Sequence, residues 1–112
     1  MTISELEIIV KTTGLVGFET QLGYVVFPVN YINQSTIEWL VNVVGDTILV
    51  RNVRYSKQLH KILYSTNYQS SIDKIDPKAF ELELVELITK WNKLNKRQEN
   101  DAMLEQLKED FV

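Results

Sequence analysis

Residues 36–55 constrain the fold of this chain more than any other stretch. Val, Ile, Thr and Trp dominate the segment, and such residues favour extended strands over helix. Gly45 and Asp46 interrupt it, and a Gly-X pair suits a two-residue type II′ turn because glycine accepts a positive φ at the first central position. The segment therefore predicts a β-hairpin in which Val43 pairs with Ile48.

The turn also fixes which side chains share a face, because successive residues of a strand point to opposite faces. Further from the turn, the hairpin pairs Val41 with Val50 and Trp39 with Asn52. The expected core face carries Ile37, Trp39, Val41, Val43, Ile48 and Val50. The other face is mixed and carries Glu38, Leu40, Asn42, Leu49, Arg51 and Val53. A helix over 37–44, capped by Thr36, is the competing interpretation, but helix-forming residues are scarce there.

The residues before the hairpin predict one helix and two short strands. Thr2 and Glu5 have the spacing of a capping box, and apolar residues follow at helical intervals, which predicts a helix over 3–12. Residues 15–19 and 23–29 then have the composition of two short strands joined by a polar bend. Together with the hairpin they predict an antiparallel sheet of about four strands.

The residues after the hairpin predict further helices. Ser56 is expected to cap a short helix that turns Leu59, Ile62 and Leu63 inward, and polar residues 65–75 are expected to form a connecting loop. Asp76 and Pro77 are typical of a helix start.

Beyond Pro77, the spacing of Phe80, Leu84, Leu87, Trp91 and Leu94 predicts a long helix over 77–96. Polar residues 98–101 are expected to interrupt it before a short last helix over 101–111. The apolar side of that last helix carries Met103, Leu104, Leu107 and Phe111. We expect this side to pack onto the sheet, and the alternative is a contact surface for a partner or a second copy.

These elements predict one α+β domain spanning residues 1–112, with the sheet packed against the first helix and the long helix, and with Trp39 near Trp91.

The chain has 112 residues, 45% hydrophobic content and no cysteine, so disulfides and thiolate metal sites are excluded. No apolar run reaches the roughly 18 residues that span a bilayer. We therefore expect a cytoplasmic protein without membrane contact.

Catalytic signatures are sparse in the sequence. His60 is the only histidine, and no acid occurs between residues 47 and 72 to orient its imidazole locally, although Ser56 lies four residues before it. The four glycines form no phosphate-binding pattern. We expect no enzyme activity, no metal site and no cofactor.

A basic stretch at 51–61 is the sharpest local feature. It is expected to form a partner-binding stripe made of Arg51, Arg54, Tyr55, Lys57 and Lys61. Such a stripe can pair with acids of the same chain, bind an acidic protein, or hold a nucleic-acid backbone with tyrosines as stacking platforms. The formal net charge of −3 makes nucleic acid the weaker choice.

The opening of the chain, a capped helix that runs into Lys-Thr-Thr-Gly-Leu at residues 11–15 and then a strand, resembles the start of phage tail-completion proteins. The resemblance covers about fifteen residues, and the rest of the chain does not follow that pattern, so it assigns no site residue.

The function we expect is that of a non-enzymatic interaction protein of phage or mobile-element origin, acting as an assembly component or an inhibitor. The alternative is a nucleic-acid-binding accessory protein that uses the basic segment 51–61. The partner we consider besides another protein is a second copy, in a homo-oligomer formed through the C-terminal helices.

Overall fold

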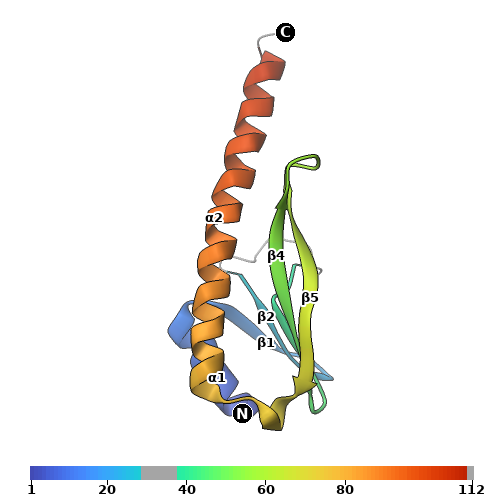
Figure 1. The fold of residues 1–112 in the computed structure, drawn as a ribbon, viewed down its shortest axis with the longest axis vertical. Coiled ribbons are helices and arrows are strands. Elements are labelled where there is room, and N and C mark those ends of the chain that lie inside the picture. The colour runs from blue at the N-terminus through green and yellow to red at the C-terminus, as the bar shows by residue number, and fades with distance from the viewer. Residues whose placement is uncertain (29–37, 111–112) are drawn as a thin grey trace.

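The computed structural model describes residues 1–28 and 38–110, with side chains to residue 108. Expectations for residues 29–37 and for Phe111 lie outside this part of the chain. The elements, in order, are α1 (Ile3–Thr13), β1 (Val16–Glu19), β2 (Gly23–Phe27), β3 (Val41–Val44), β4 (Thr47–Ser56), β5 (Lys61–Ser71), the 3₁₀ turn η1 (Ile72–Lys74) and α2 (Pro77–Asp110) (Figure 1).

The sheet has five strands and confirms the predicted antiparallel meander with one strand more than expected. Its order is β1-β2-β3-β4-β5, and every neighbouring pair is antiparallel. The central hairpin has the predicted register, with Val43 opposite Ile48. Gly45 has a φ of 59°, whereas Asp46 is not among the residues with positive φ, and this combination is that of a type II′ turn. The competing helix over 37–44 is wrong, since residues 41–44 are β3.

The fifth strand replaces the helix expected after Ser56 and the loop expected over 65–75, and both of those predictions are wrong. A turn over residues 57–60 brings the chain back as β5, which pairs with β4 along its whole length. Ser56 caps this turn instead of a helix, because its Oγ accepts a hydrogen bond from Leu59 N–H at 3.2 Å. The alternation of Ile62, Tyr64 and Tyr68 is the strand signal that the polar residues between them concealed.

A register shift in the β4–β5 pair changes which residues of β4 face the core. Val50 lies opposite Tyr68 while Arg51 lies opposite Thr66, so Asn67 is an extra residue in β5, as in a β-bulge. Before the shift, Ile48 and Val50 are buried, and after it Val53 is. The expected mixed face is therefore wrong for Val53. It is also wrong for Leu40, which is fully buried just before β3 begins.

Both predicted helix starts are confirmed. Thr2 and Glu5 form the expected capping box of α1, with hydrogen bonds of 3.2 and 3.0 Å. Asp76 caps α2, because its carboxylate accepts a hydrogen bond from Ala79 N–H at 3.1 Å. These caps satisfy amide protons that have no partner inside the helix.

The predicted end of the long helix is wrong. α2 continues without interruption through residues 98–101 to Asp110 and has 34 residues, so there is no separate last helix. Neither Gly nor Pro occurs in this segment, and its polar side chains contact the β4–β5 hairpin. These contacts compensate for the weak helix propensity of Asn and Asp. The resulting rod dominates the shape of the molecule, whose longest extent is 56 Å (Figure 1).

One hydrophobic core joins the two helices to a single face of the sheet. Paired residues of neighbouring strands, such as Tyr24, Val43 and Ile48, are buried on this face. From the helices, the core receives Leu6, Ile9, Val10, Phe80, Leu84, Leu87, Ile88 and Trp91. Trp39 does not join Trp91 there as expected. It is half-buried under Arg51, which also lies near the ring of Tyr64, and Tyr64 accepts a hydrogen bond from Trp91.

Two leucines of α2 test this packing directly. Leu84 is 0% exposed and Leu82, half a turn away, is 69% exposed. Leu84→Ala should lower the free energy of unfolding by about 2–5 kcal/mol, because it leaves a cavity in the core. Leu82→Ala should change it by less than about 0.5 kcal/mol. Urea denaturation of both variants checks this, and equal losses would contradict the side of α2 assigned to the core.

Candidate functional site

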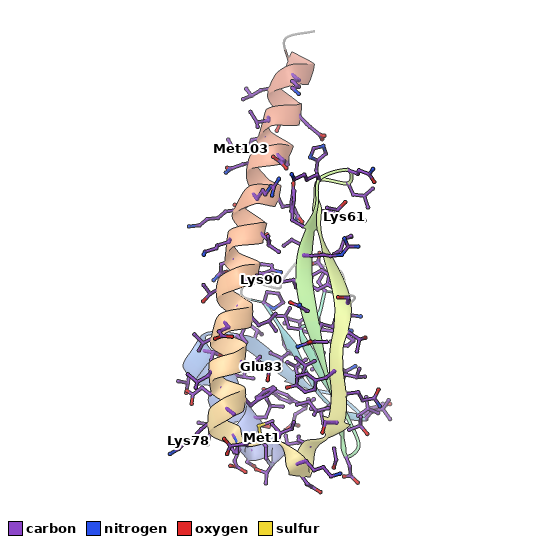
Figure 2. The ribbon with its side chains drawn as sticks, viewed as in Figure 1. Met1, Lys61, Lys78, Glu83, Lys90 and Met103 are labelled. Carbon is purple, nitrogen blue, oxygen red and sulfur yellow. The ribbon has the colours of Figure 1, made fainter. Side chains whose placement is uncertain are left out.

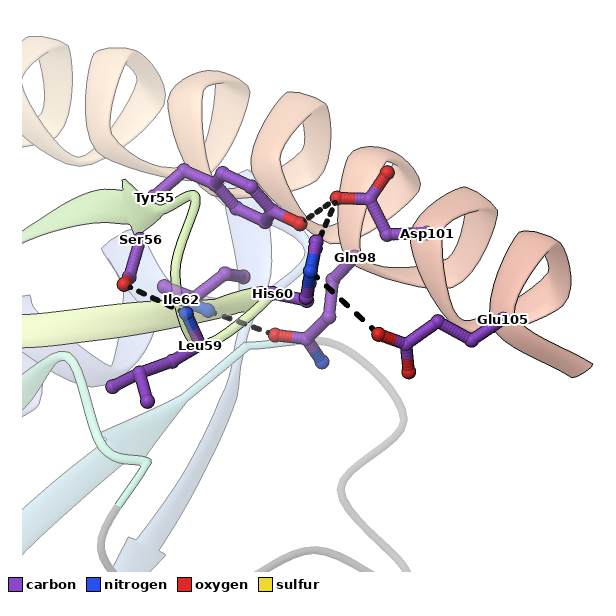
Figure 3. A network of polar contacts seen from close by, with 8 residues as sticks. All are labelled: Tyr55, Ser56, Leu59, His60, Ile62, Gln98, Asp101 and Glu105. Atoms are coloured by element: carbon purple, nitrogen blue, oxygen red, sulfur yellow. Dashed lines mark hydrogen bonds and ion pairs between the residues drawn. The ribbon is translucent and has the colours of Figure 1, made fainter.

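The tip of the β4–β5 hairpin lies against the second half of α2, and the two together form what we call the distal end of the molecule (Figure 3). Residues 54–63 come from the hairpin and residues 97–108 from the helix. The long antiparallel pairing of β4 with β5 carries the tip out from the sheet, and the continuous helix runs beside it. Residues about forty positions apart in the sequence are thereby brought into contact.

A network of polar contacts, which we call the polar clasp, holds the tip to the helix. The Tyr55 hydroxyl donates a hydrogen bond to Asp101 Oδ2, and His60 Nδ1 lies 3.3 Å from the same oxygen. His60 Nε2 lies 3.6 Å from Glu105 Oε1. Gln98 Oε1 accepts a hydrogen bond from Ile62 N–H at 2.9 Å. Each contact joins the hairpin to α2, so the clasp fixes the direction of the helix beyond the core (Figure 3).

The contacts of the polar clasp also shift the pKa values of two of its residues, Asp101 and Tyr55. Hydrogen bonds from Tyr55 and then from His60 stabilise the ionised carboxylate, so they hold the pKa of Asp101 below its ordinary value. Partial burial raises the pKa of Tyr55, and the neighbouring Asp101 raises it further. The Arg97 guanidinium lies 4.2 Å from the centre of the Tyr55 ring, a cation–π distance. At neutral pH Asp101 is therefore an anion enclosed by donors.

The sequence did not indicate that His60 has an acidic partner, because Asp101 is 41 residues away on another element. The backbone of His60 has a φ of 53°, a left-handed conformation uncommon outside glycine, and the turn thereby directs the imidazole at the helix. Both ring nitrogens face carboxylates, and Ser56 bonds to Leu59. This geometry is that of a contact between elements. The absence of enzyme activity stays a prediction.

Within residues 1–28 and 38–108, no three His, Cys, Asp or Glu side chains are placed to hold a metal ion together. None of the helices in the described part of the chain combines the length and the apolar character needed to cross a bilayer.

The residues of the expected basic stripe do not form one surface. Arg51 is half-buried, with its guanidinium 3.5 Å from the centre of the Trp39 ring, and burial lowers its pKa. Tyr55 belongs to the polar clasp. The stripe is thus divided, and its use for binding stays a prediction.

The remaining members of the stripe, Arg54, Lys57 and Lys61, are exposed around the hairpin tip. In the described part of the chain, no carboxylate lies within ion-pair distance of these three cations. Internal pairing with residues 1–7 or 81–86 therefore does not occur for them among the described residues.

The expected apolar contact surface lies on the projecting part of α2. Met103, Leu104 and Leu107, which we call the distal strip, are 62%, 56% and 49% exposed. Figure 2 shows Met103 on the part of the helix that passes the hairpin tip, where Lys61 begins β5. The helix turns its polar side to the hairpin and leaves the distal strip outside.

Comparison with known proteins adds no relative to this description. The chain matches no protein-family model, and searches of curated proteins and of solved structures returned no significant match.

The lowered pKa of Asp101 predicts how the clasp responds to acid. A carboxyl group whose pKa is lower in the folded state stabilises that state when the pH is above the ordinary pKa of the group. This contribution is lost as the pH falls through the lowered pKa. The reporter is the Ile62 amide, which is bonded to Gln98 only while the helix is docked. Its hydrogen-exchange protection, measured by NMR, should be full at neutral pH and should decrease as Asp101 becomes protonated.

A matched pair of variants isolates Asp101 in this experiment. Asp101→Ala should reduce the protection of Ile62 at neutral pH and remove its acid dependence. Glu99→Ala removes a nearby carboxylate of the same helix, bonded to Asn95 within α2, and should leave the protection unchanged. If Ile62 exchanges at the same rate in both variants and in the unmodified protein, the clasp does not hold the hairpin to the helix.

Proposed function

We propose that this chain is a non-enzymatic interaction protein that binds another protein through its distal end, as an assembly component or an inhibitor. The observation that carries the proposal is the distal strip, three large apolar side chains exposed next to one another on a helix that projects past its own core. Isolated apolar residues are common on protein surfaces, but a contiguous group marks a contact surface.

The arrangement of charge supports a partner with acidic character. Of the acids of the distal end, Asp101 and Glu105 face His60 in the polar clasp, and Glu99 is exposed on α2. The cations Lys93 and Lys96 are exposed on α2 before the distal strip, whereas Arg97 stacks on Tyr55 of the hairpin. A surface with an apolar centre and a basic surround complements a partner with an apolar patch framed by carboxylates.

The length of α2 supports the same proposal. Apart from the clasp residues, the side chains of residues 102–108 are exposed, so few contacts within the described chain stabilise this stretch. Helices of fewer than about 12–15 residues are marginal in water without tertiary contacts. Continuation from the docked part of α2 keeps the last turns helical, and burial of the distal strip against a partner would add the missing contacts.

The second candidate is a nucleic-acid-binding accessory protein. The observation that favours it is the exposure of Arg54, Lys57 and Lys61 around the tip with no carboxylate paired to them in the described residues. The acidic balance of the whole chain, with a formal net charge of −3, weighs against this candidate. Residence in the cytoplasm and an origin in a phage or mobile element belong to the proposal as well.

Site-specific crosslinking in living cells tests the proposal. A photoreactive phenylalanine analogue at Met103 should form a discrete covalent adduct with a protein, because this side chain lies in the proposed contact. The same analogue at Gln69, which is exposed on strand β5 and not on α2, should give much less adduct. An adduct with nucleic acid would favour the second candidate, and the absence of any adduct specific to Met103 would contradict the proposal.

A further inference from the structure

A second exposed apolar group lies at the opposite end of α2. Ile8 of α1 is 65% exposed, and Leu82 and Val85 of α2 are 69% and 45% exposed. We call these three residues the basal surface. A groove of about 170 Å³ between α1 and the first turns of α2 is lined by Ile8, with Pro77 and Glu81 on its other side. Its volume is of the size of one large apolar side chain.

Val85 of the basal surface and Met103 of the distal strip lie on the same side of α2. Val85 and Met103 are 18 residues apart in the sequence, which is five turns of an α-helix with 3.6 residues per turn. The side chains therefore point in the same direction from the helix axis, about 27 Å apart along it. Figure 2 shows Lys78 near the start of α2 and Met103 in its distal part.

The charges around the two apolar groups are opposite in sign. Glu5 and Glu81 line the basal groove, and Glu86 is exposed one turn beyond Leu82, with Lys78 as a cation among them. The distal strip instead follows the exposed cations Lys93 and Lys96 and precedes Lys108, with Glu99 as an acid among them. An acidic frame at one end and a basic frame at the other are complementary only when two molecules meet by unlike ends.

We propose that the partner of the distal strip is the basal surface of a second copy of this chain, so that molecules associate head to tail. This inference rests on the proposed function and names its partner. A distal apolar side chain enters the groove beside Ile8, and Lys93 and Lys96 approach the carboxylates of the next molecule. Because the two surfaces differ, the contact is heterologous and can repeat into an open chain.

The closed alternative is a two-fold dimer in which antiparallel α2 helices bury both apolar groups at once. In one register of such a pair, Leu82 of one copy lies opposite Leu107 of the other. The numbers of any two facing residues then add to 189, so Lys93 of each copy lies opposite Lys96 of the other. Four ammonium groups would then meet at the centre of the contact. Like charges placed opposite each other are destabilising, so this register is unfavourable, and the open head-to-tail contact does not require it.

Sedimentation of the purified full chain tests the proposal. Species larger than a dimer should form as the concentration rises to about 1 mM. They should form more readily in about 50 mM salt than in about 500 mM salt, because salt screens the charges that frame the contact. A chain that stays monomeric at the highest concentration in low salt would overturn the inference. The proposed function would still stand if the crosslinker at Met103 captured a different protein.

Charge reversal separates a specific contact from a general effect of net charge. Lys93→Glu with Lys96→Glu reverses the distal frame, and Glu81→Lys with Glu86→Lys reverses the basal frame. Each double variant should associate at least about tenfold more weakly than the unmodified chain. A mixture of the two should recover the association, because each then offers the other a complementary end.

The matched control is Lys57→Glu with Lys61→Glu at the hairpin tip. It changes the net charge by the same amount as Lys93→Glu with Lys96→Glu. These two lysines are exposed but lie on the hairpin, away from the distal strip. The control should associate as the unmodified chain does, and circular dichroism should show the same helix content in all variants. Equal weakening in the control, or no recovery in the mixture, would overturn the head-to-tail contact.

Discussion

The continuity of α2 through residues 98–101 is the constraint on which the distal end depends. This stretch holds Asn100 and Asp101, which are weak helix formers, and no apolar side chain from it enters the core. Gln98 and Asp101 instead bond to the β4–β5 hairpin, and the hairpin thereby supports the helix where its own packing ends. Without these bonds the basal surface and the distal strip would not share one straight axis.

The same contacts determine what the distal end offers to other molecules. Asp101 and Glu105 are oriented towards His60 and Tyr55, so carboxylates that would otherwise offset the neighbouring cations face the hairpin. The outer side of the helix is left with the distal strip and a basic frame. An internal electrostatic arrangement thus accounts for a surface that is locally basic on a chain with a net negative charge.

Local signals in the sequence predicted the parts of the fold that depend on local chemistry. The capping box at Thr2, the cap at Asp76 and the type II′ turn at Gly45 each need only a few neighbouring residues, and all three are confirmed. The strand β5 was missed because its stability comes from distant partners: Tyr64 bonds to Trp91, and Tyr68 bonds to Glu83. The pairing of His60 with Asp101 was missed for the same reason. The polar residues at 98–101 predicted a break in the helix, and the hairpin that uses them as partners could not be inferred from their spacing.

The orientation of the last turns of α2 tests the central claim most directly. Residual dipolar couplings of the backbone amides, measured by NMR on the dilute monomer, report the axis of each helical stretch independently. We expect residues 80–94 and 100–108 to fit one helix axis, with helical chemical shifts throughout 95–101. Two differently oriented helices, or non-helical shifts at 98–101, would contradict the continuous rod and the surfaces that depend on it.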